Sequence, residues 1–203
     1  MTTSMSSDGQ KANVLFVCLG NICRSTMAEG VFRDVAAAHP LVNKIDSCGT
    51  GAYHAGEGPD RRTMATLRRH GISNYKHAAR KITSQDFLEF DYLLAMDQYN
   101  LEDLLDLRSS IVASQKNPGS NRPTRGRGTR ATFDVDVDPD AKLAEVRLFG
   151  DFRPGGTLTQ RVGSGNVVED PYYGGADGFE EVYQQVVQFS KNFLEHLEKK
   201  NQD

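Results

Sequence analysis

The chain has 203 residues with a formal net charge of −3, and 25 % of its residues are charged. This length fits one domain with a full hydrophobic core, and the slightly acidic balance argues against a general electrostatic attraction to nucleic acid. Three cysteines are too few for a disulfide framework and favour a reducing compartment, so we expect a cytoplasmic protein. No apolar stretch resembles a secretory signal or reaches the length of a membrane span.

The first predicted elements enclose a short turn. The apolar run over residues 14–17 predicts a buried strand, and residues 27–38 carry apolar side chains at helical spacing. The octapeptide from Cys18 to Ser25 is therefore a tight turn from the end of a strand into a helix, where open α/β sheets bind ligands. Its backbone N–H groups and the helix N-terminus would form a cradle for an anion.

Two side chains in this turn carry reactive chemistry. Cys18 stands at its entrance, and Arg24 stands near its exit. The helix dipole and Arg24 both favour the thiolate form of the cysteine, and a guanidinium can hold two oxygens of one phosphate. A thiolate nucleophile inside an anion cradle is suited to attack on phosphorus.

The rest of the chain alternates between strands and helices. Asp60 can act as the N-cap of a helix that runs through Arg69. Further predicted strands cover residues 44–48, 91–96 and 146–149, and further predicted helices cover residues 101–107 and the stretch from Asp177 onward. We therefore expect an α/β fold, with a four-stranded parallel sheet flanked by helices on both faces.

One long segment departs from this alternation. Residues 109–142 contain a basic run without acids, followed by aspartates that alternate with valines. Such a composition buries little apolar surface, so we expect a low-order insertion at about 109–142 within a single domain over residues 12–200. Residues 1–11 are predicted to form a flexible tail.

A second chemical element lies just before the last helix, in the sequence Asp170-Pro171-Tyr172-Tyr173. Cleavage of a tyrosyl phosphate requires a proton for the leaving phenolate, and a carboxylic acid in a loop over the nucleophile can supply it. Asp170 is the candidate because Pro171 stiffens its position. Tyr172 and Tyr173 would form an aromatic wall for a flat phenolic substrate.

The Cys-x5-Arg-Ser turn and the Asp-Pro-Tyr-Tyr loop together resemble the low-molecular-weight protein tyrosine phosphatases of the acid phosphatase type. The resemblance covers residues 12–108 and about 143–198. It implies a phosphatase loop after the first strand and hydrolysis of phosphotyrosine in proteins and of small aryl phosphates through a phosphocysteine intermediate. It also implies no metal or other cofactor, inhibition by inorganic phosphate or vanadate, and a monomer or weak dimer.

The resemblance assigns roles to single residues. Cys18 resembles the nucleophile, Arg24 the phosphate-holding residue, and Asp170 the acid of the first step and the base of the second. Ser47 resembles a support for the loop through Asn21, which tolerates a positive φ, and Tyr53 joins Tyr172 and Tyr173 at the rim. The remaining phosphate-binding positions are Leu19, Gly20, Asn21, Ile22, Cys23 and Ser25.

Several alternatives remain open at this point. Cys23 is either a small core residue or a resolving thiol that forms a reversible disulfide with Cys18. An arsenate reductase on the same scaffold would need further thiols, and no cysteine follows Cys48. A non-catalytic phosphate-binding module would not need Asp170. Relatives that dephosphorylate arginine carry a smaller Thr in the loop, so Ile22 favours tyrosine.

Overall fold

A parallel sheet forms the centre of the computed structural model, which describes residues 11–116, 138, 140–173 and 177–202. Its four strands have the order β2-β1-β3-β4. β1 pairs in parallel with β2 and β3, and β3 pairs in parallel with β4. The predicted four-stranded parallel sheet is therefore confirmed, with the strands at Ala12–Cys18 (β1), Val42–Gly49 (β2), Tyr92–Ala95 (β3) and Glu145–Leu148 (β4).

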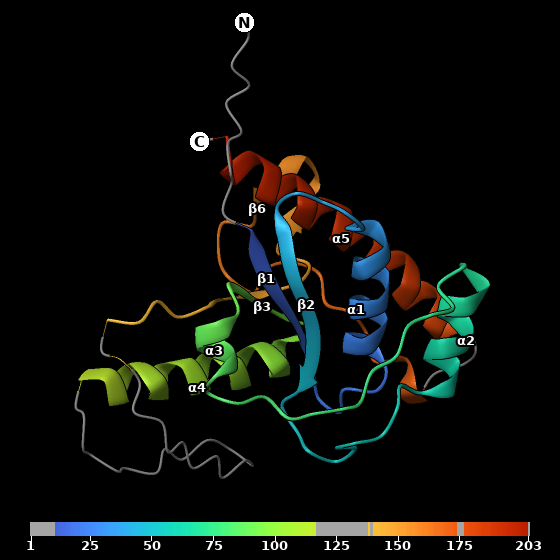
Figure 1. The fold of residues 1–203 in the computed structure, drawn as a ribbon, viewed down its shortest axis with the longest axis horizontal. Helices are drawn as coiled ribbons and strands as arrows, with labels where there is room; N and C mark the ends of the chain where they lie inside the picture. The colour runs from blue at the N-terminus through green and yellow to red at the C-terminus, as the bar shows by residue number, and fades with distance from the viewer. Residues whose placement is uncertain (1–10, 117–137, 139, 174–176, 203) are drawn as a thin grey trace, which may run out of the picture.

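Helices cover both faces of this sheet, as predicted (Figure 1). The side chains of β1 alternate between two hydrophobic clusters, with Val14 and Phe16 in one and Leu15 and Val17 in the other. The first cluster packs against α1 (Arg24–Val35), α2 (Arg61–Arg69) and α5 (Asp177–Lys200). The second packs against α3 (Asp86–Glu89) and α4 (Gln98–Lys116). None of the described helices has the length and apolar character needed to cross a membrane.

Two helix boundaries differ from the sequence prediction. α1 ends at Val35 rather than at residue 38, and Ala38 has a φ of 58°, which does not continue a helix. α4 continues to Lys116, so residues 109–116 are helical and the expected low order over that stretch is wrong. Ile111 is buried in the second cluster, which favours the longer helix. Residues 117–137 and 139 of the predicted insertion lie outside the described residues, as do residues 1–10 of the predicted tail.

A small hairpin between β4 and the loop at Asp170–Tyr173 was not predicted from the sequence. It consists of β5 (Phe152–Arg153), the 3-10 turn η1 (Pro154–Gly156) and β6 (Thr157–Leu158). The carboxylate of Asp151, which is fully buried, organises this segment. It accepts hydrogen bonds of 2.8–3.2 Å from the backbone N–H groups of Leu148, Gly163 and Gly165 and from the hydroxyl of Thr159.

Phe193 of α5 lies at the centre of an aromatic cluster. Its ring centroid is 4.8 Å from that of Phe152, 5.1 Å from that of Tyr92 and 5.7 Å from that of Phe32. The side chain is fully buried. It therefore joins the last helix to the sheet, to α1 and to the hairpin.

Substitution of Phe193 by Ala is expected to lower the free energy of unfolding by about 4 kcal/mol, because it removes these contacts and leaves a cavity. Urea denaturation of the purified variant measures this loss. Tyr99→Ala is the matched control: its side chain is 80 % exposed, and the expected change is within about 0.5 kcal/mol. Similar losses in both variants would contradict the assignment of Phe193 to the core.

Candidate active site

The turn between β1 and α1 brings the predicted nucleophile into a polar, buried environment. Cys18 is only 3 % exposed, and its Sγ lies 3.1 Å from the Oγ of Ser25. The backbone N–H of Asn21 donates to the same sulfur at 3.3 Å. Because α1 begins at Arg24 without a side-chain cap from Cys23, its first N–H groups can serve an anion.

Asn21 gives the turn its shape. Its φ is 57°, a left-handed conformation that Asn adopts more readily than most residues. Its side-chain amide donates to the hydroxyls of Ser25 and Ser47, each at 2.9 Å, so the predicted contact between Asn21 and Ser47 is present. Its Oδ1 accepts from the backbone N–H of Arg80 at 2.9 Å and lies 2.8 Å from Nε2 of His77.

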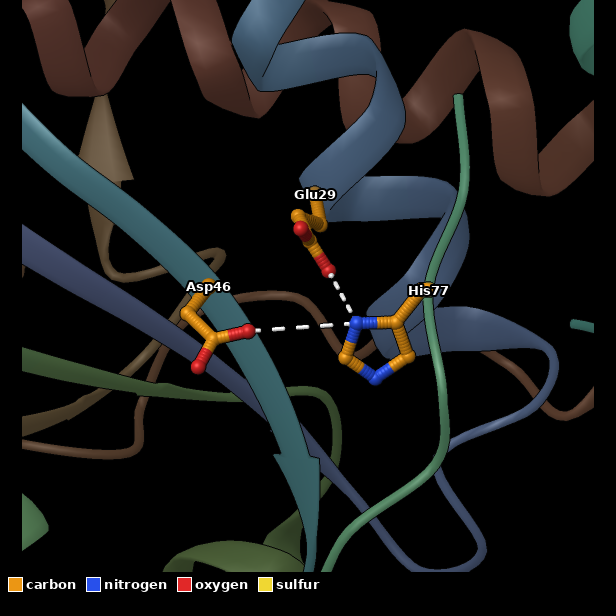
Figure 2. Close-up of side chains that lie close together, drawn as sticks. All are labelled: Glu29, Asp46 and His77. Atoms are coloured by element: carbon orange, nitrogen blue, oxygen red, sulfur yellow. Dashed lines mark ion pairs between the residues drawn. The ribbon is translucent and has the colours of Figure 1, made fainter. Parts of the chain in front are cut away.

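His77 faces two carboxylates, those of Glu29 and Asp46, as Figure 2 shows. Its Nδ1 lies 3.1 Å from Glu29 of α1 and 3.8 Å from Asp46 of β2. The oxygen of Asn21 that faces Nε2 also accepts from a backbone N–H, so both ring nitrogens of His77 face acceptors.

Glu29, Asp46 and His77 offer possible ligand atoms within 4.8 Å of one another, but Glu29 is already fully engaged. Its Oε2 accepts from the hydroxyls of Ser47 and Tyr75 at 2.7 and 2.8 Å, and its Oε1 binds Arg33. The group is thus explained as a hydrogen-bonded support behind the turn. Although burial opposes it, hydrogen bonding from His77, Ser47 and Tyr75 lowers the pKa of Glu29.

Arg24 connects the turn to two acids from distant segments. Its guanidinium binds Asp97, which follows β3, and its Nη2 donates to Oδ2 of Asp170 at 3.1 Å. Its Nη1 also lies 3.4 Å from the backbone carbonyl of Val168. Burial disfavours the charge of Arg24, but Cys18 and the two carboxylates outweigh it and raise the pKa of Arg24.

These groups open into a cavity of about 320 Å³. Tyr53 and Tyr172 stand at its rim with exposed fractions of 73 % and 39 %. Asn21, Ser25 and Ser47 are buried beneath the turn, and the side chain of Tyr173 lies outside the described part of the chain. The cavity is lined by Cys18, Leu19, Gly20, Ile22, Cys23, Arg24, Tyr53, His54, Asp170 and Tyr172.

Comparisons with known proteins identify the family of the chain. Residues 13–116 match the family described as low molecular weight phosphotyrosine protein phosphatase. A protein of that name from Schizosaccharomyces pombe is 42 % identical, over 91 % of this chain and 96 % of the relative. The chain belongs to the low molecular weight phosphotyrosine protein phosphatase family.

Solved structures share the fold of this phosphatase family member. A protein tyrosine phosphatase from Entamoeba histolytica is 30 % identical, with a TM-score of 0.64 over 94 % of this chain and 99 % of that one. An arginine phosphatase from Drosophila is 29 % identical, with a TM-score of 0.63 over 91 % of this chain and 96 % of that one. The α/β architecture with the phosphatase loop after β1 is therefore confirmed.

Sequence reasoning did not assign several residues of this site. Asp97 could have been found, because an acid directly after the third parallel strand lies at the same end of the sheet as Cys18. Glu29 and His77 carried no comparable signal, since His77 contacts Asn21 and Glu29 reaches the turn only through Ser47 and His77.

Cys23 lines the same cavity as Cys18. Burial, followed by the negative charges of Asp60, Cys18 and Asp170, raises the pKa of Cys23 to about 12. Its thiol is therefore protonated at neutral pH. All three cysteines are free, and a resolving role for Cys23 stays a prediction.

Glu29→Gln is expected to lower the free energy of unfolding by about 3 kcal/mol at pH 7, because it removes a buried partner of His77. The carboxylate contributes fully above the ordinary pKa of 4.5, and its contribution is lost as the pH falls through its lowered folded value. The difference in the free energy of unfolding between wild type and variant should therefore narrow as the pH falls below 4.5.

Chemical denaturation at several pH values measures this difference. Glu102→Gln, at an exposed position of α4, is the control and should differ little from wild type throughout. A stability gap for Glu29→Gln that is independent of pH would contradict the ionised pair.

Proposed function

We propose that this protein is a metal-independent protein tyrosine phosphatase that hydrolyses phosphotyrosine in proteins and small aryl phosphate monoesters through a phosphocysteine intermediate. The observation that carries the proposal is the meeting of the Cys18 thiol, the Arg24 guanidinium and the Asp170 carboxylate in one cavity. A nucleophile, a group for the phosphate charge and a proton donor are what cleavage of a phosphate ester requires. All three are side chains of the chain itself.

In the first step, the phosphate of the substrate binds the N–H groups of residues 19–25 and the guanidinium of Arg24. The Sγ of Cys18 attacks phosphorus, so that a P–S bond forms while the bond from phosphorus to the phenolic oxygen breaks. Asp170 donates its proton to that oxygen. Arg24 and the loop N–H groups stabilise the charge on the equatorial oxygens in the transition state.

In the second step, Asp170 acts as the base. It accepts a proton from a water molecule that attacks phosphorus, the P–S bond breaks, and inorganic phosphate leaves. The hydroxyl of Ser25, 3.1 Å from Sγ, can donate to the thiolate that is regenerated. Inorganic phosphate and vanadate should compete with substrate because both fit the same cradle.

The preference for an aryl phosphate is inferred from the residues at the rim of the cavity. Exposed rings of Tyr53 and Tyr172 flank the cavity and suit a flat phenolic group. The similarity to the Drosophila arginine phosphatase makes phosphoarginine the competing substrate. Ile22 in the cradle favours tyrosine, and turnover of matched phosphotyrosine and phosphoarginine peptides distinguishes the two.

Two other functions have less support. An arsenate reductase would need a relay of thiols, and the chain has no cysteine after Cys48. A non-catalytic phosphate-binding module would not require Asp170 beside Arg24. The three free thiols agree with a reducing, cytoplasmic location, and we propose that the protein acts there as a monomer or weak dimer.

Cys18→Ser is expected to abolish hydrolysis of para-nitrophenyl phosphate measured with a chelator present, because the covalent intermediate can no longer form. Binding of inorganic phosphate or vanadate, followed by calorimetry, should persist because Arg24 and the loop N–H groups remain. Substantial residual turnover would exclude a phosphocysteine mechanism.

Asp170→Ala is expected to reduce kcat/KM, which reports the first step, by about a hundredfold or more for phenyl phosphate, whose leaving group needs a proton. The loss should be smaller for para-nitrophenyl phosphate, because its phenolate is a better leaving group. Steady-state kinetics with a series of aryl phosphates tests this. A loss independent of the leaving group would mean that Asp170 is not the proton donor.

A further inference from the structure

Arg62, in the first turn of α2, binds the acid at the beginning of its own helix. Its Nε and Nη2 donate to the two carboxylate oxygens of Asp60 at 3.0 and 2.9 Å. Asp60 also caps the helix by accepting from the backbone N–H of Arg62 at 2.7 Å. The fork geometry fixes the plane of the guanidinium.

The same Asp60 is joined to the phosphatase loop. Its backbone N–H donates to the carbonyl of Ile22 at 2.8 Å, and Ile22 lies between Cys18 and Arg24 in the cradle. The start of α2 is therefore held at a fixed distance from the nucleophile. Any group that Arg62 holds is positioned relative to that loop.

The group that Arg62 holds belongs to the loop of the proton donor. Its remaining nitrogen, Nη1, donates to the backbone carbonyl of Tyr172 at 3.0 Å. The guanidinium carbon lies 5.2 Å from the ring centroid of Tyr172 and 4.6 Å from that of Phe179, the latter buried in α5. Arg62 thus joins α2, the 3-10 turn η2 (Pro171–Tyr173) and the first turn of α5.

Tyr172 is also the residue that orients the carboxylate of Asp170. Its backbone N–H donates to Oδ1 of Asp170 at 3.0 Å, while Oδ2 faces Arg24. One residue therefore has its carbonyl bound by Arg62 and its N–H bound to the proton donor. Without the bond from Arg62 to its carbonyl, Tyr172 would hold the carboxylate of Asp170 less firmly.

We propose that Arg62 is a positioning residue for proton donation, which holds Tyr172 so that the Asp170 carboxyl faces the leaving oxygen above Cys18. The inference rests on the proposed phosphatase function and deepens it. Arg62 touches none of the reacting atoms, and its contacts are with Asp60, Tyr172 and Phe179. Its effect should therefore resemble a partial loss of the acid rather than a loss of phosphate binding.

The test compares Arg62→Ala and Arg62→Gln with the neighbouring Arg61→Ala, which removes an exposed positive charge from the same helix turn. Full-length protein is assayed with phenyl phosphate and para-nitrophenyl phosphate. We expect both Arg62 variants to lose about tenfold in kcat/KM for phenyl phosphate and about twofold for para-nitrophenyl phosphate. Arg61→Ala should keep the wild-type ratio between the two substrates.

A double-mutant cycle separates positioning from general damage to the fold. In an Asp170→Asn background, Arg62→Ala should not further change the ratio of activities on phenyl phosphate and para-nitrophenyl phosphate, because no acid remains to be positioned. The inference would be overturned if both Arg62 variants had the same ratio of activities on phenyl phosphate and para-nitrophenyl phosphate as Arg61→Ala. It would also be overturned if Arg62→Ala changed this ratio as much in the Asp170→Asn background as in the wild-type background. If Arg62→Ala does not fold, Arg62→Gln decides the question. Wild-type protein that hydrolyses neither substrate would instead refute the proposed function itself.

Discussion

The left-handed backbone at Asn21 is the constraint on which the site depends. A φ of 57° turns the chain so that the N–H of Asn21 points at the sulfur of Cys18. Such a conformation costs free energy for a residue with a side chain, and surrounding contacts must hold it. Here they come from α1, from β2 and from the segment at residues 77–80, through Ser25, Ser47, His77 and the backbone of Arg80. The cradle is therefore shaped by tertiary structure rather than by its own eight residues.

Charge is arranged in two layers around this turn. Behind it, the imidazole of His77 meets the buried carboxylate of Glu29, so the support is polar but internally paired. In front of it, Arg24 carries the positive charge that an incoming phosphate needs, between Asp97 and Asp170. Asp97 accepts a hydrogen bond from the backbone of Asn100 at the start of α4, which fixes it as a static partner. Asp170 lines the cavity, where its carboxyl group can reach a substrate as an acid and as a base.

The parts that the sequence predicts are those with contiguous or periodic signals. The Cys18–Ser25 turn, the Asp170–Tyr173 loop and the four strands belong to this class. The second half of α4 was missed because Ser109 and Ser110 resemble helix-ending residues, whereas their hydroxyls bond back to the carbonyls of Leu105 and Asp106. Arg62 was missed for another reason: its partner Tyr172 is 110 residues away, and no local pattern encodes that contact.

The topology also explains how a long segment of unusual composition can coexist with this site. In this parallel sheet, β1, β2 and β3 end at Cys18, Gly49 and Ala95, so their carboxyl ends lie on the same side of the sheet as the cavity. α4 begins next to Asp97, at the carboxyl end of β3, and its 19 residues extend for about 28 Å to Lys116. β4 then starts at Glu145, at the amino ends of the parallel strands, whereas Cys18 lies at the carboxyl end of β1. The described chain resumes beside the end of α4, where the side-chain amide of Gln115 donates to the carbonyl of Asp138 at 2.9 Å. Arg24, Asp97 and Asp170 are instead held together by contacts between the turn after β1, the end of β3 and the loop before α5.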